Sequence, residues 1–164
     1  MATAFTPIAW QSLTGTASSV TFSSIPSTYR DLRLVAQFTY TGAGNVSPLI
    51  RINGDASPNY SYVSQTGDGT SPGSYSSTSA SSWSPQTVYG NSTTTITFVM
   101  DFLDYSAIDK HKVSVARWNN TAIGVEEDFY RWANTSAITS FVISNSNTPT
   151  FAVGSTFALY GIAA

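Results

Sequence analysis

The sequence has 164 residues, a formal net charge of −2 at pH 7 and no cysteine, with 10% charged and 13% aromatic residues. The length suits one domain, the low charge with many aromatic residues excludes a disordered chain, and the lack of cysteine excludes disulfides, thiolate catalysis and cysteine-ligated metals. The weakly acidic balance supplies no basic surface for nucleic acid or anionic membranes, so neither is expected as a partner.

The first 16 residues are predicted to form an N-terminal arm or edge strand, ahead of a single domain at residues 17–164. They lack the basic segment and long apolar run of a signal peptide, so synthesis in the cytoplasm without a cleaved export signal is expected. Phe5, Ile8 and Trp10 would order on a partner rather than on the chain's own domain, which makes Trp10 a candidate partner contact.

After this arm, apolar and polar residues alternate in short runs separated by Gly, Pro, Asn and Ser, as is typical of half-buried strands. Between Leu32 and Tyr40, for example, every second residue is apolar or aromatic. Similar runs occupy residues 18–23, 49–53, 60–65, 94–103, 112–119, 124–133, 138–144 and 156–162. Eight to ten short strands without an amphipathic helix predict an all-β fold, an antiparallel β-sandwich of jelly-roll type.

The stretch RINGDASPNYSY between two of these strands could be a site or an elaborate turn. Asn53-Gly54 is the pair favoured where a turn needs positive φ, and Asp55 is suited to accept nearby backbone N–H bonds. We interpret this stretch as a structural turn, in which Arg51 is expected to pair with Asp55.

Residues 64–92 are rich in Ser, Gly and Thr and nearly free of charge, which predicts a long loop inserted in the sandwich. A loop of this length is either a mobile surface insertion or an interface loop, with aromatic residues as rigid contact points. The tyrosines just before it lie two residues apart and share a face, either packed on the sandwich or offered to a partner. The candidate partner or glycan contacts are Tyr60, Tyr62, Tyr75, Trp83 and Tyr89, with Trp10.

Few residues could carry chemistry. His111, between two lysines and without a G-x-S-x-G motif, is interpreted as an exposed edge residue and not as a catalytic base. The acidic residues at 126–128 divide between the two faces of a strand, and a solvated edge that discourages strand addition is the preferred interpretation. Neither 53–55 nor 67–69 has the ligand spacing of a calcium loop. No enzymatic activity, cofactor or metal is expected.

Four segments carry a resemblance: VTFSSIPSTYRDLRLV at 20–35, RINGD with NYSY at 51–62, NTSAITSFVIS at 134–144 and GSTFALYGI at 154–162. Together they resemble a family of virion structural proteins of tailed phages, notably those of cyanobacteria and other aquatic bacteria. In that family the Ile-Pro-x-x-Tyr-x-Asp-Leu, Arg-x-Asn-Gly-Asp and x-Leu-Tyr-Gly-Ile motifs recur as scaffold around a variable insert. The resemblance implies a β-sandwich carried on the virion.

Two roles follow from this resemblance. The first is a capsid decoration or cement subunit, expected as a homotrimer, which stabilises the head by bridging the major capsid protein or other virion proteins. The second is a tail-fibre or head-fibre module that binds host-surface glycan through aromatic rings. Aromatic residues buried against a neighbouring subunit would favour the first role, and aromatic residues exposed in one shallow patch would favour the second.

Overall fold

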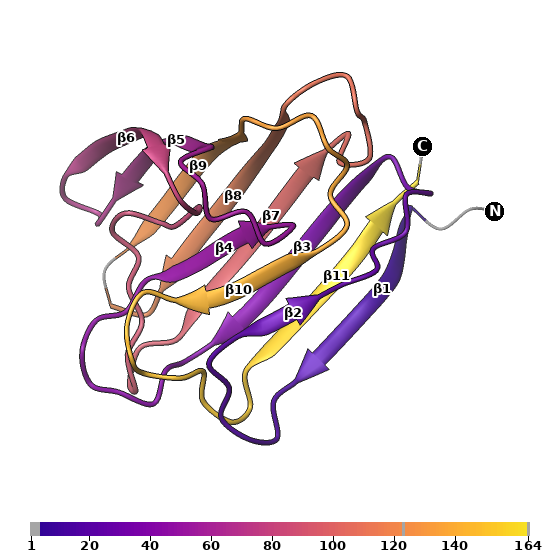
Figure 1. The fold of residues 1–164 in the computed structure, drawn as a ribbon. Helices are drawn as coiled ribbons and strands as arrows, with labels where there is room; N and C mark the ends of the chain where they lie inside the picture. The colour runs from indigo at the N-terminus through magenta and orange to yellow at the C-terminus, as the bar shows by residue number, and fades with distance from the viewer. Residues whose placement is uncertain (1–3, 123, 164) are drawn as a thin grey trace.

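The computed structural model describes residues 4–122 and 124–163, which form eleven β-strands and no helix (Figure 1). The strands are β1 (Phe5–Ser12), β2 (Val20–Phe22), β3 (Asp31–Phe38), β4 (Pro48–Ile52), β5 (Tyr60–Gly67), β6 (Pro72–Ala80), β7 (Ile96–Leu103), β8 (Lys112–Asn120), β9 (Val125–Trp132), β10 (Phe141–Asn145) and β11 (Thr156–Ile162).

The strands form two antiparallel sheets of unequal size. The large sheet has eight strands in the order β1-β11-β3-β7-β8-β9-β5-β6, and the small sheet has the order β2-β10-β4. Figure 1 shows the small sheet lying across one face of the large sheet. The expected all-β, antiparallel β-sandwich is therefore confirmed, although the described strands number eleven where eight to ten were predicted.

The core lies between the two sheets, on what we call the inner face of the large sheet. Alternate residues of β3 and β7 are buried there because successive side chains of a strand point to opposite faces. Aromatic rings join the layers: Phe102 of β7 stacks on Phe141 of β10, with ring centroids 4.4 Å apart. Such aromatic contacts bury large areas and hold the small sheet on the large one.

The Ser-rich insert is not a loop along its whole length. Strand β5 continues to Gly67, and β6 pairs with it antiparallel from Pro72 to Ala80. Asp68 stabilises the turn between them by accepting the backbone N–H groups of Thr70 and Ser71. Composition was misleading here because β6 is largely exposed, so its residues need no apolar alternation to form a strand.

Residues 81–92, which we call the strap, run alongside β4 after β6. Trp83 exchanges backbone hydrogen bonds with Ile50 of β4, and Gly90 does the same with Val46. The strap therefore extends the small sheet beyond β4 and is anchored near both of its ends.

Strand β1 is the edge strand that the sequence predicted, but it orders on the chain itself. It pairs with β11 from Phe5 to Ser12, so the expectation that these residues order only on a partner is wrong. Phe5 lies opposite Ile162, and the backbone N–H of Ala163 donates to the carbonyl oxygen of Ala4 (3.4 Å). Both ends of the described chain thus lie at one corner of the large sheet (Figure 1).

Candidate functional site

The outer face of the large sheet, which points away from the small sheet, carries exposed apolar side chains. Five of them on β5, β7, β8 and β9 are between 42% and 61% exposed: Val63, Leu103, Val113, Val125 and Phe129. In the strand register Phe129 lies opposite Val63 on one side and Val115 on the other. An apolar zone therefore runs across neighbouring strands through Val63, Phe129, Val115, Val113 and Leu103, whereas Val125 is separated from Phe129 by Glu127.

Two ion pairs join charged side chains of the outer face, while Arg131 of the same face donates to the ring of His111. The guanidinium of Arg33 donates twice to the carboxylate of Asp101 (2.6 and 2.7 Å). The Nε of Arg117 donates to Glu127 (3.0 Å). Both pairs join residues that face each other across adjacent strands. Partly exposed pairs of this kind stabilise a sheet by less than about 1 kcal/mol each, and they neutralise four of the charged side chains on this face.

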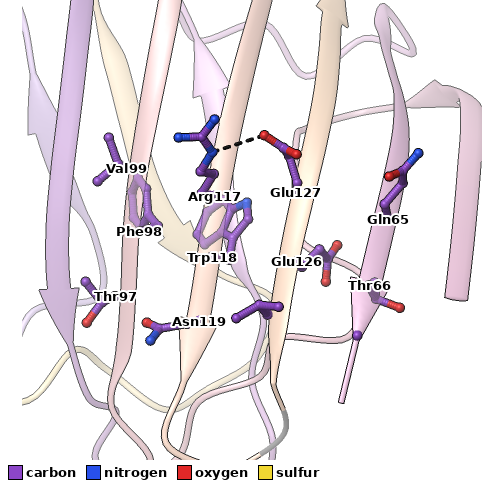
Figure 2. Close-up of a pocket in the computed structure, with 12 residues that line it drawn as sticks. Gln65, Thr66, Thr97, Phe98, Val99, Arg117, Trp118, Asn119, Glu126 and Glu127 are labelled. Atoms are coloured by element: carbon purple, nitrogen blue, oxygen red, sulfur yellow. Dashed lines mark hydrogen bonds and ion pairs between the residues drawn. The ribbon is translucent and has the colours of Figure 1, made fainter. Parts of the chain in front are cut away.

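A hollow of about 560 Å³ lies in the outer face over β7, β8, β9 and β5. Its lining includes the apolar Val99 and Val125 and the polar Gln65, Thr97 and Asn119. Figure 2 shows these polar side chains spread around the hollow, with the ion pair of β8 and β9 above it. The outer face is therefore recessed and mixed in character at this end.

Two of the expected contact residues are in the core. Tyr60 and Trp83 are fully buried, and Trp83 stacks on Tyr130 with ring centroids 5.2 Å apart. Trp83 also donates its Nε1–H to the carbonyl oxygen of Arg131 (3.3 Å). They cannot contact a partner in this fold, because the strap carries Trp83 inward between the sheets.

The other four expected contact residues do not gather in one place. Tyr62 is half-buried against Tyr130, and Tyr89 is half-buried, with its hydroxyl donating to a carbonyl oxygen of the strap. Tyr75 and Trp10 are exposed, but they lie on β6 and β1, the opposite edges of the large sheet. The shallow aromatic patch expected of a glycan site is therefore not formed by these six residues.

The turn after β4 has the backbone expected of it. Asn53 and Gly54 have φ values of 52° and 71°, and the N–H of Asp55 donates to the carbonyl oxygen of Ile52. The expected ion pair within the turn is not formed, because Arg51 instead donates to the carbonyl oxygen of Ser81 (3.2 Å).

Asn53 also holds the segment before β10. Its Oδ1 accepts the backbone N–H groups of Thr139 and Ser140, and its Nδ2 donates to the carbonyl oxygen of Ala137. Two of the segments that carry the family resemblance, 51–62 and 134–144, thus contact each other directly. Their role here is structural.

The acidic residues at 126–128 do not form a solvated edge. Strand β9 lies inside the large sheet between β8 and β5, and Glu126 and Asp128 are 2% and 0% exposed. Only Glu127 points to the outer face, where it meets Arg117. The alternation between faces was predicted, but burial of two carboxyls was not, since sequence patterns mark charged residues as exposed.

His111, which was expected to be an exposed edge residue, is exposed, but the strand that follows it, β8, lies inside the large sheet between β7 and β9. The Nδ1 of His111 accepts from the Nε of Arg131 (3.1 Å). Lys112 is buried, with its Nζ donating to the carbonyl oxygens of Lys110 and Thr135. Burial lowers the pKa of Lys112. The alternation along β8, which places residue 112 in phase with the buried side chains, was the available signal.

Within the described residues, no group of three or more His, Cys, Asp or Glu side chains is placed to hold a metal ion. No helix in the same ranges is long and apolar enough to cross a membrane. A scan against models of known protein families finds none that matches this chain. A search of curated proteins likewise returns no significant match.

Proposed function

We propose that this chain is a structural protein of a tailed-phage virion, a decoration or cement subunit that binds the major capsid protein through the outer face of its large sheet. The observation that carries the proposal is the zone of exposed apolar residues on that face, since exposed apolar zones of this kind mark interaction surfaces. The sequence resemblance supplies the virion setting.

The dimensions of the outer face suit a stable protein contact. Eight strands about 4.8 Å apart, each about eight residues long at about 3.3 Å per residue, span roughly 1,000 Å². A standard interface covers about 800 Å² on each partner. The near-neutral charge of the face favours a protein surface over nucleic acid or an acidic polysaccharide.

In this proposal the protein acts by adding contacts and not by catalysis. Each subunit bridges neighbouring capsid proteins, and a homotrimer would engage several of them at once. Linked contacts reinforce one another through high effective concentration. The head would gain resistance to internal pressure because its lattice contacts are reinforced from outside.

A fibre module that binds host-surface glycan is the second candidate. The hollow of the outer face favours it, because about 560 Å³ falls within the range of small-ligand sites and Gln65 and Asn119 could bond sugar hydroxyls. Against it, Trp83 and Tyr60, two of the rings expected to stack on sugars, are buried.

The test is co-sedimentation of the purified protein with expanded, undecorated capsids and, separately, with host cells. Phe129→Lys should weaken capsid binding about tenfold or more, because it places a charge in the apolar zone. Ile108→Lys is the matched control, since Ile108 is 77% exposed in the loop between β7 and β8. Equal capsid binding by both variants, or cell binding that host polysaccharide competes away, would overturn the decoration role.

A further inference from the structure

Strand β9 places two carboxyls side by side in the core. Glu126 and Asp128 are two residues apart, so both point to the inner face. Burying a carboxylate is unfavourable unless hydrogen-bond donors or a cation compensate for lost water. The two side chains differ sharply in this respect.

Glu126 is fully supplied with donors, all from the strap. One oxygen accepts the backbone N–H of Gln86 (2.6 Å). The other accepts the N–H and the hydroxyl of Thr87 (both 2.8 Å) and the N–H of Val88 (3.3 Å). The carboxyl of Glu126 therefore fastens the middle of the strap to the large sheet.

Asp128 is poorly supplied. Its Oδ2 accepts the hydroxyl of Tyr130 (2.5 Å), but its Oδ1 is buried without a donor among the described residues. Ser64 lies directly opposite on β5, and its buried hydroxyl faces the carboxyl outside good hydrogen-bonding geometry. Glu126 lies two residues away on the same buried face of β9, so the two carboxyls are close neighbours, and two adjacent buried carboxyls favour retention of a proton.

We propose that the buried pair of Asp128 and Glu126 holds a single proton in the folded protein and acts as a pH-sensitive latch for the strap, which loosens when that proton is lost. This latch does not depend on the capsid-binding role, because it concerns the inner face and can be tested on the isolated protein.

The surroundings favour the protonated form of Asp128. The titratable side chains near it are Glu126 and Tyr130 on β9 and Tyr62 on β5. On β8 its direct neighbour is Ala116, and from the strap the side chain of Gln86 reaches Tyr62. Neither of these last two residues carries a charge that could offset a second carboxylate.

Burial is the main cause that raises the pKa of Asp128, from 3.8 to about 7; the nearby hydroxyls of Ser64 and Tyr130 lower it, and the charge of Glu126 raises it further. Because the folded pKa lies above the ordinary value, the stabilisation is complete below pH 3.8 and is lost as the pH rises through about 7. Loosening therefore accompanies the rise towards neutral and alkaline pH.

The strap is the element that should give way. The strand pairs of β9 with β5 and β8 continue along its length, whereas the backbone N–H groups in the middle of the strap donate to Glu126 and the side chain of Val88 packs in the core. On either side of this middle part, the backbone hydrogen bonds of Trp83 with Ile50 and of Gly90 with Val46 remain intact. Opening is thus confined to the residues around 86–88, and it lets water reach both carboxyls.

The test is amide hydrogen exchange of Gln86, Thr87 and Val88 between pH 4 and 9, followed by NMR and corrected for intrinsic base catalysis. The corrected exchange rates give the equilibrium constant for opening of the strap. If opening releases one proton, this constant should rise by up to about tenfold per pH unit between pH 4 and 7 and then level off. Asp128→Asn should abolish this rise, and Asp109→Asn, which removes an exposed carboxyl from a loop, should preserve it.

An unchanged rise in Asp128→Asn, or a pH-independent opening constant in the parent protein, would overturn the latch. If Asp128→Asn does not fold, the ¹³C shift of the Asp128 carboxyl in the parent protein decides. A midpoint near 7 that coincides with the change in strap exchange supports the latch, and a midpoint near 3.8 contradicts it.

Discussion

At the scale of single residues, the Asp55 carboxylate joins three parts of the chain. It accepts the backbone N–H of Ser57, the Nδ2 of Asn59 and the Nε1–H of Trp132 at the end of β9 (2.7 Å). Burial works to raise the pKa of Asp55, but these hydrogen bonds outweigh it and lower the pKa to about 2. Asp55, which the sequence marks as a turn residue, therefore also links the turn after β4 to the end of β9.

Replacing Asp55 with Ala should reduce the free energy of unfolding by about 1–3 kcal/mol at pH 7, because Trp132 loses its acceptor. The depressed pKa means that this stabilisation is complete above pH 3.8 and is lost as the pH falls through about 2. Urea denaturation at pH 7 and pH 2 measures both effects. The exposed Asp109→Ala is the control, and a difference as large at pH 2 as at pH 7 would contradict the account.

Position 161, in the LYGI motif of β11, requires glycine because the ring of Tyr29 lies close to its backbone. A Cβ at this position would lie 2.3–2.4 Å from ring carbons of Tyr29. Gly161→Ala should therefore destabilise the protein by about 1–3 kcal/mol through overpacking. Thermal and urea unfolding of Gly161→Ala, Tyr29→Ala and the double variant would measure the coupling. Additive effects of the two substitutions would exclude the clash as the cause.

At the scale of elements, the two halves of the Ser-rich insert have different roles. Strand β6 extends the large sheet as an exposed edge, whereas the strap carries Trp83 into the core and binds Glu126. Removal of the whole insert would therefore remove a core residue together with a surface hairpin. The insert is not a dispensable loop.

A matched pair of substitutions separates the two halves. Trp83→Ala should lower the free energy of unfolding by about 3–5 kcal/mol, because a fully buried ring is lost. Tyr75→Ala, at a position 47% exposed on β6, should change it by no more than about 0.5 kcal/mol. Guanidinium denaturation measures both, and similar values for the two variants would refute this division.

The strands with clear alternation, such as β3 and β7, could be predicted from the sequence because burial on one face imposes a period of two. Strand β6 could not, since a strand exposed on both faces has no such period. The apolar outer face is also visible in the sequence, because Val99, Val113 and Val115 occupy positions of the alternation that would be polar on a solvated face. The buried carboxyls depend on tertiary contacts with the strap, which no local pattern records.

At the scale of the whole molecule, the core is one continuous set of buried residues drawn from both sheets and from the strap. Rings from distant parts of the chain stack within it, across the two sheets in Phe102 and Phe141 and between neighbouring strands in Phe38 and Phe157. No smaller part of the described chain has a core of its own. The sandwich should therefore unfold as a unit.

Far-UV and near-UV circular dichroism should accordingly report the same urea midpoint. Folding should take milliseconds to seconds, because six of the nine strand pairs among the described residues join strands that are not consecutive in the chain. Stopped-flow mixing and equilibrium titration together test this. Separate midpoints for the two spectral regions would indicate that the small sheet melts on its own.

The meeting of β1 and β11 at one corner also has a practical consequence. A short linker could join the two ends into a circle, and the chain could be reopened at the exposed turn between β5 and β6 without cutting a core strand. Cargo fused to either end of the described chain would leave from the same corner, so two different proteins could be carried close together on a single scaffold.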